Sequence, residues 1–310
     1  MGLLHCRSWD RPSHFVVCPP LKRYRLKTYR GSARRRFVYS EESGEAAIVK
    51  FCVLASGSSG NAALLVTENT CVLVDAGLSM RELGKRLASI GEDPERIFER
   101  LDAILITHEH CDHVSGLPVL ARSKKIRATI HMTHLTAPAI DWGETAPGRL
   151  ETFQAGAALQ IGDIEVQSFT IPHDAIDPVG FAFEAQGVRI AIATDLGYIP
   201  ESVKFHLRRT DLLLLEANHD LDMLKVGPYP WAVKQRVMSR VGHLSNLVMS
   251  DYLEQDLDAA TCQLVLGHLS QQNNHPAIVH MMATQALDGR GLHTRLSIAS
   301  QHTPSVVFQF

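Results

Sequence analysis

The chain has 310 residues, of which 45% are hydrophobic and 21% charged, a composition typical of globular proteins. This length allows one large α/β domain, and no apolar run approaches the ~18 residues of a membrane-spanning helix. The formal net charge of −2 argues against nucleic-acid binding by bulk charge, so such binding needs a local basic patch. Six cysteines without a CxxC pair indicate reduced thiols, and we expect a soluble, cytoplasmic protein.

The first 46 residues differ from the rest because they are strongly basic, with ten Lys or Arg and four acidic residues. The basic clusters at 22–25 and 34–36 are compatible with a nucleic-acid-binding arm or with an organelle-targeting segment. The segment has no sustained period of 2 or 3.6 residues. The favoured interpretation is a disordered or misassigned extension that lies outside a fold formed by residues 47–310.

The remainder mixes strand and helix patterns, which favours sheets covered by helices. Strands are predicted at residues 46–54, 62–68, 71–74, 101–106, 127–131, 158–161, 164–169, 178–183, 189–193, 212–215, 263–267, 295–299 and 306–310. Helices are predicted at residues 80–90, 114–123 and 276–287, with two more beginning after Trp231 and at a cap formed by Ser245 or Asn246.

A dense histidine motif follows the apolar run that ends at residue 106. It reads His-Glu-His-Cys-Asp-His from His108 to His113. In a compact turn His108 and His110 can hold one metal ion, while Asp112 and His113 can hold a second from the other side. Four such groups in six positions are costly to bury unless a metal ion takes their lone pairs. We interpret Cys111, inside the motif, as a packing residue.

Acidic or imidazole groups also stand at the ends of other predicted strands, namely Asp75, His173, Asp195, Glu216 and His268. The strand ends along one edge of a layered α/β fold converge, so we expect these groups to share a cleft with the motif. Seven candidate ligands then divide into His108, His110 and His173 for one ion, Asp112, His113 and His268 for the other, and Asp195 bridging them. Asp75 is a candidate support for a ligand. Two divalent ions about 3.5–4 Å apart can clamp a phosphodiester and lower the pKa of a shared water.

Candidate substrate contacts lie in two places. Ser58, Ser59 and Asn61 belong to a turn of small residues that either holds a phosphate or is a plain hairpin turn. Lys234 and Arg236 either neutralise a nucleic-acid backbone or lie on a solvated helix face. The nearby aromatics Tyr229 and Trp231 can stack on a base, although core packing is the favoured interpretation for both.

The spacing His-x-His-x-Asp-His, with His173, Asp195 and His268 downstream, resembles the metallo-β-lactamase superfamily. Further segments are similar to its WalJ/YycJ-type branch, namely residues 53–61, 173–180, 216–220, 227–231, 242–246 and 267–270. The resemblance covers roughly residues 48–310. It implies an α/β fold in the form of a four-layer αββα sandwich, two divalent metal ions, either zinc or manganese, and a metal-dependent 5′→3′ exonuclease that acts on DNA.

Glu216 and His243 stand in places similar to a Glu–His pair of the tRNA 3′-processing nucleases of the same superfamily. That similarity implies that His243, oriented by Glu216, contacts the scissile phosphate or protonates the leaving oxygen. Asp112 is then expected to handle the water proton as well as to bind metal. The alternative functions are an RNA-processing nuclease or a small-molecule cyclic phosphodiesterase on the same fold. A thioester or lactone hydrolase is disfavoured, because it does not need the Glu216–His243 acid.

Overall fold

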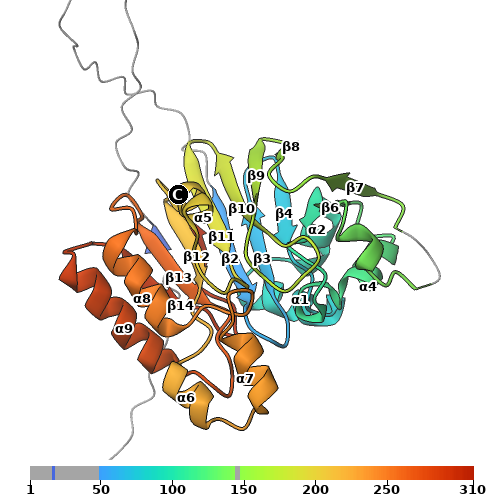
Figure 1. Ribbon diagram of the computed structural model, residues 1–310. Coiled ribbons are helices and arrows are strands. Elements are labelled where there is room, and N and C mark those ends of the chain that lie inside the picture. The colour runs from blue at the N-terminus through green and yellow to red at the C-terminus, as the bar shows by residue number, and fades with distance from the viewer. Residues whose placement is uncertain (1–15, 18–48, 144–146) are drawn as a thin grey trace, which may run out of the picture.

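The computed structural model describes residues 16–17, 49–143 and 147–310 (Figure 1). The expected basic extension therefore lies outside the described residues, apart from Val16–Val17. Those two residues form a short strand, β1, that pairs in parallel with the last strand of the chain.

The first sheet has its antiparallel part at one side and its parallel part at the other. Its strands, in spatial order, are β1 (Val16–Val17), β15 (Phe308–Gln309), β2 (Lys50–Ala55), β3 (Ala62–Val66), β4 (Cys71–Val74), β5 (Ala103–Leu105), β6 (Thr129–Thr133) and β7 (Leu150–Phe153). Strands β2 to β4 are antiparallel neighbours, whereas β4 to β7 run in parallel. The carboxyl ends of β4 and β5 consequently meet at one edge of the sheet.

The second sheet repeats this division. Its strands, in spatial order, are β14 (Arg295–Ile298), β13 (Gln263–Gly267), β12 (Leu212–Glu216), β11 (Val188–Ala193), β10 (Val179–Ala185), β9 (Ile164–Thr170) and β8 (Ala158–Ile161). Strands β11 to β14 are parallel, and β8 to β11 are antiparallel. The carboxyl ends of β11, β12 and β13 therefore also lie together.

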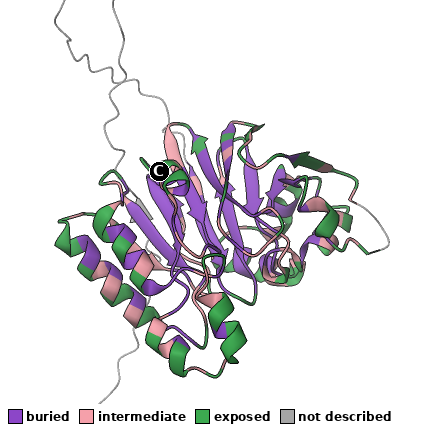
Figure 2. Ribbon diagram, in the orientation of Figure 1, coloured by how far each residue is buried: buried purple, intermediate pink, exposed green. Residues whose placement is uncertain are grey.

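Three buried apolar clusters fill the spaces between four layers, as the buried strands and exposed outer helix faces of Figure 2 show. One cluster packs the two sheets face to face. Another packs the first sheet against α1 (Met80–Ser89), α2 (Pro94–Arg100) and α4 (Leu117–Arg122). The third packs the second sheet against α5 (Glu201–Leu207), α8 (Asn246–Gln255) and α9 (Pro276–Gly289). This arrangement confirms the predicted αββα sandwich.

Short elements complete the chain. They are α3 (Cys111–Val114), the 3₁₀ turn Ala137–Ala139, α6 (Leu221–Val226) and α7 (Trp231–Val237). Among the described residues, none of the helices has the length and apolar character needed to cross a membrane.

The helix predicted at 114–123 corresponds to α4, which begins only at Leu117 after Gly116, and the single turn α3 precedes it. The Gly116 amide donates to the Ala76 carbonyl at 2.8 Å, and a Cβ at this position would lie 1.9 Å from the Leu78 carbonyl oxygen. The close approach of the β4 loop therefore requires glycine and breaks the helix. The sequence pattern does not predict α2, α5, α6 or β7, although Asp93 and Pro94 form an ordinary helix start for α2.

Candidate metal centre

The candidate residues follow the ends of parallel strands in both sheets. Asp75 follows β4 and His268 follows β13, while Asp195 lies two residues beyond β11. All three adopt positive φ angles, of 60°, 56° and 62° respectively. This left-handed region is sparsely populated by residues other than glycine, and occupying it costs on the order of 1–3 kcal/mol where it persists at functional sites. The surrounding fold therefore imposes these turns at the strand ends.

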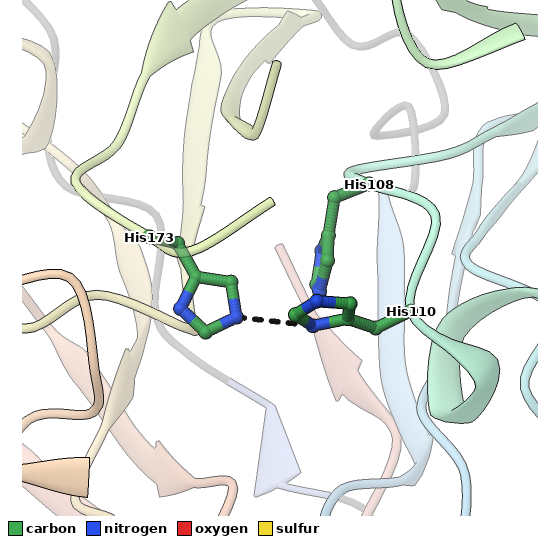
Figure 3. Close-up of side chains that lie close together, drawn as sticks. All are labelled: His108, His110 and His173. Atoms are coloured by element: carbon green, nitrogen blue, oxygen red, sulfur yellow. Dashed lines mark hydrogen bonds between the residues drawn. The ribbon is translucent and has the colours of Figure 1, made fainter. Parts of the chain in front are cut away.

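One group of three imidazoles comes from the turn after β5 and the loop after β9 (Figure 3). His110 Nδ1 and His173 Nε2 are 3.2 Å apart, and the His108 and His110 ring centroids are separated by 4.6 Å. In two of these rings, those of His108 and His173, Nδ1 makes a contact with another residue of the protein. His108 Nδ1 lies 3.0 Å from Thr107 Oγ1, and His173 Nδ1 lies 3.0 Å from the Gly242 carbonyl. The remaining nitrogens of these rings are thereby directed toward a common point.

A second group combines Asp112, His113 and His268. Asp112 Oδ2 is 3.5 Å from His113 Nε2 and 3.3 Å from His268 Nε2. The opposite nitrogens are again fixed, because His113 Nδ1 pairs with Asp75 Oδ2 at 2.8 Å and His268 Nδ1 with Glu216 Oε1 at 3.0 Å. Hydrogen bonds of this kind set the tautomer and the ring orientation of metal-binding histidines.

Asp195 lies between the two groups. Its Oδ2 is 3.3 Å from His113 Nε2, and its Oδ1 is 4.0 Å from His173 Nε2 and 3.3 Å from His268 Nδ1. Burial would raise the pKa of Asp195, but the neighbouring His268 and His113 hold it well below the usual range. The side chain is therefore an anion in contact with members of both groups.

The donor set fits divalent metal ions. His108 Nε2 and Asp195 Oδ2 are both buried and have no hydrogen-bond partner in the described structure, although such groups are normally satisfied. Burial, followed by the nearby His113, keeps the pKa of His108 well below its ordinary value, so its ring is a neutral lone-pair donor. Neutral imidazole and ionised carboxylate are the forms that bind zinc and similar cations.

Glu216 and His243 form a pair that contacts these groups, and together with Asp195 and His268 they are a further candidate set of metal donors. His243 Nδ1 lies 2.7 Å from Glu216 Oε1, while Glu216 Oε2 accepts the Leu196 and Leu244 amides at 2.9 and 3.1 Å. Burial favours the neutral acid, but His243 and then His268 lower the pKa of Glu216 to about 2. Burial also opposes the charged His243, yet the Glu216 carboxylate raises its pKa above the ordinary value. His243 is 24% exposed, and its ring centroid lies 5.1 Å from that of His173.

The turn between β2 and β3 is expected from the sequence to offer three side chains to a phosphate, and the structure disagrees with this expectation at Asn61. Ser58 and Ser59 are exposed, as a phosphate contact requires. Asn61, in contrast, is buried, and its amide contacts Asp112 rather than solvent. Its expected contact with substrate is therefore contradicted, because the Gly57–Asn61 hydrogen bonds turn the side chain inward.

On α7, Lys234 differs from both of its expected roles, whereas the exposure of Arg236 is compatible with either. Lys234 is buried, and its Nζ donates to the Lys225 carbonyl at 2.7 Å, so it neither meets a nucleic-acid backbone nor lies on a solvated face. Arg236 is exposed but already pairs with Asp174 through its Nε. Packing of α7 beside α6 positions the Lys234 amine under the end of α6, which the local sequence does not indicate.

Trp231 and Cys111 are expected from the sequence to be packing residues, but both are exposed to solvent. Trp231 is 62% exposed, so the core-packing interpretation is wrong for this residue, while Tyr229 is half-buried. Cys111 is exposed at the start of α3 and is not a packing residue. Both lie on short helices, α7 and α3, and other described residues leave them open to solvent.

Sequence reasoning missed several residues that hold the candidate ligands. Thr107 contacts His108 through its hydroxyl, and its amide and hydroxyl donate to Asp75 at 2.9 and 3.0 Å. Asp174 Oδ1 lies 3.6 Å from His173 Nε2. Their positions immediately before His108 and after His173 were the only available signals, whereas the Gly242 carbonyl carries none.

Comparison with known proteins defines the class. The model of the family described as "Beta-lactamase superfamily domain" matches residues 70–288, and the chain belongs to this family. Its fold is similar to that of the metallo-β-lactamase fold protein YhfI from Bacillus subtilis, with a TM-score of 0.64 at 17% identity over 83% of this chain and 99% of that one. The metallo-β-lactamase fold implies divalent metal binding.

Two curated relatives are much closer in sequence. The chain is 38% identical to the exodeoxyribonuclease WalJ of Streptococcus pneumoniae serotype 2, over 77% of this chain and 88% of that protein. It is 36% identical to the exodeoxyribonuclease YycJ of Bacillus anthracis, over 78% of this chain and 90% of that protein.

Proposed function

We propose that this protein is a metal-dependent phosphodiester hydrolase that acts on DNA as a 5′→3′ exonuclease. The observation that carries the proposal is the Glu216–His243 pair at 2.7 Å beside two groups of metal-type donors joined by Asp195. Relatives at 36–38% identity over most of the chain are named exodeoxyribonucleases, which supports DNA as the substrate.

Two ions are assigned to the two groups. His108, His110 and His173 would hold the first, Asp112, His113 and His268 would hold the second, and Asp195 would contact both. The excess of imidazoles suits zinc, whereas the shared carboxylates suit manganese, and we propose one of these two metals. Asp75 and Glu216 hold the rings of His113 and His268, so each fixes a ligand of the second ion.

When bound, the ions lower the pKa of a water and neutralise charge on the phosphate. Asp112 would accept the proton of the attacking water, because its carboxylate is partly exposed whereas those of Asp195 and Glu216 are buried. Burial opposes its charged form, but hydrogen bonds from His113 and His268 keep the pKa of Asp112 below the usual range, so it begins the reaction ionised. As the water oxygen bonds to phosphorus, the ester P–O bond breaks.

His243 supplies the proton for the departing oxygen. Its Nδ1–H is committed to Glu216, which leaves Nε2 as the proton donor toward the substrate. The Glu216 anion stabilises the protonated ring, and its four contacts with His243, His268, Leu196 and Leu244 keep it in place. A positioned general acid of this kind contributes roughly 10²–10⁴-fold to the rate.

Contacts beyond the reacting phosphate come from the exposed residues around the cluster. Ser58 and Ser59 offer hydroxyls to a phosphate, and Arg236 carries a charge at the rim that Asp174 holds in place. Trp231 presents an exposed ring on α7, the helix whose Val237 carbonyl accepts the His243 amide at 2.9 Å. An unpaired base stacked on that ring would add about 1–3 kcal/mol.

The proposal is tested with end-labelled duplex DNA and chelator-stripped protein to which zinc or manganese is returned. Single-stranded RNA and a small phosphodiester, bis(p-nitrophenyl) phosphate, are assayed in parallel. Metal-dependent release of mononucleotides from 5′ ends is the expected result. Cleavage of RNA alone, or turnover of only the small ester, would retain the metal chemistry and overturn DNA as the substrate.

A further inference from the structure

The Asn61 side chain connects the turn after β2 with the candidate metal centre. It is 6% exposed, and its Oδ1 accepts the Gly57 amide at 2.8 Å. Its Nδ2 lies 3.1 Å from the Gly57 carbonyl, 3.1 Å from Asp112 Oδ2 and 3.0 Å from His113 Nε2. The Gly57 amide fixes which end of the Asn61 amide is the oxygen, so Nδ2 is the atom that faces Asp112 and His113.

The backbone holds Asn61 in this position. Its own amide donates to the Asp112 carbonyl at 2.7 Å, and its carbonyl accepts the Gly77 amide at 3.0 Å. A Cβ on Gly77 would lie 1.7 Å from the Asp112 carbonyl oxygen and 2.7 Å from the Asn61 nitrogen. Glycine therefore permits three chain segments to meet with almost no free space between them, and the Asn61 amide cannot shift far from the metal centre.

Two of the atoms that Asn61 Nδ2 contacts belong to candidate ligands of one metal ion, namely Asp112 Oδ2 and His113 Nε2. These two atoms are 3.5 Å apart. Because Nδ2 also contacts the Gly57 carbonyl, the Asn61 amide ties both candidate ligands to the turn after β2.

We propose that Asn61 is a positioning residue for the second metal ion. Its amide holds Asp112 and His113 together beside the place of that ion and fixes the direction of the Asp112 carboxylate. This inference rests on the proposed function, because it takes Asp112, His113 and His268 as one ion's ligands. It assigns Asn61 to assembly of the centre, in place of the substrate contact suggested by its sequence context.

Stepwise calorimetric titration of zinc into the chelator-stripped full chain tests the proposal. Wild type should bind two ions, and Asn61→Ala should weaken the second binding event by about 10–100-fold, the usual effect of removing a residue that orients a metal ligand. The affinity of the first binding event should stay within twofold of the wild-type value. Gln301→Ala is the matched control, because Gln301 anchors the same turn through the Ser59 amide and the Gly60 carbonyl without contacting Asp112; both of its events should match wild type.

The inference would be overturned if the affinity of the second binding event in Asn61→Ala equals that of wild type, or if the affinities of both events fall equally. Binding of a single ion by wild type would instead overturn the two-ion assignment of the proposed function. The isosteric Asn61→Asp variant serves if Asn61→Ala fails to fold, because it keeps the acceptor for the Gly57 amide. Its melting temperature should fall clearly in the metal-free form and little in the metal-saturated form, where the ion separates the carboxylates. An equal fall in both forms would show a purely structural role.

Discussion

His243→Ala separates acid catalysis from metal binding. The substitution removes the only ring assigned to protonate the leaving oxygen, and a loss of 10²–10⁴-fold in kcat on DNA corresponds to about 3–5 kcal/mol of transition-state stabilisation. The fold should tolerate the change. Glu216 retains its contacts with His268 Nδ1 and with the Leu196 and Leu244 amides, so no buried carboxylate is left without partners.

The assay compares two leaving groups on the same variant. Cleavage of DNA expels an alkoxide that needs a proton, whereas bis(p-nitrophenyl) phosphate expels a stable phenolate that does not. We expect kcat on DNA to fall by at least 100-fold and kcat on the small ester to fall by less than 10-fold, with metal content unchanged by elemental analysis. Equal losses on both substrates would refute the role as an acid, and loss of metal would make His243 a ligand.

Three further outcomes follow from the same geometry. His113→Ala and Asp195→Ala should each abolish cleavage while circular dichroism stays that of the folded protein; full activity in an Asp195→Ala variant of verified metal content would contradict the bridging role. Glu216→Gln removes the anion that raises the His243 pKa, so activity, which is lost as pH rises through that pKa, should be lost at lower pH, and a pH profile that does not move would contradict the coupling. Trp231→Ala should raise KM for single-stranded DNA by roughly 5–150-fold without affecting the small ester, and Val226→Ala, at an even more exposed position on α6, should leave both unchanged.

The sequence predicted the centre better than its surroundings, for a physical reason. His108, His173 and Asp195 lie two or three residues beyond β5, β9 and β11, and the edge at which strands end is fixed once the strands pair. Such positions can be recognised from local pattern alone. The division into two groups of three with Asp195 between them needs only this convergence.

The contacts that depend on tertiary packing were not predictable. Asn61 turns inward because Gly57 and Gly77 allow the backbone segments to meet, and Lys234 is buried because α7 packs beside α6. The edge strand β7, with the sequence Leu-Glu-Thr-Phe, has two adjacent exposed residues, so it shows no clear alternation of polar and apolar side chains. The exposure of Trp231 likewise depends on which helices receive a covering layer.

Titration of activity with metal tests the central claim most directly. Chelator-stripped protein at micromolar concentration receives zinc or manganese in measured steps, and exonuclease turnover on DNA is followed at each step. The two-ion account predicts little turnover up to one equivalent and a steep rise toward two, because Asp195 must hold both ions for the centre to form. Full turnover at one equivalent, or turnover that persists in excess chelator, would contradict it.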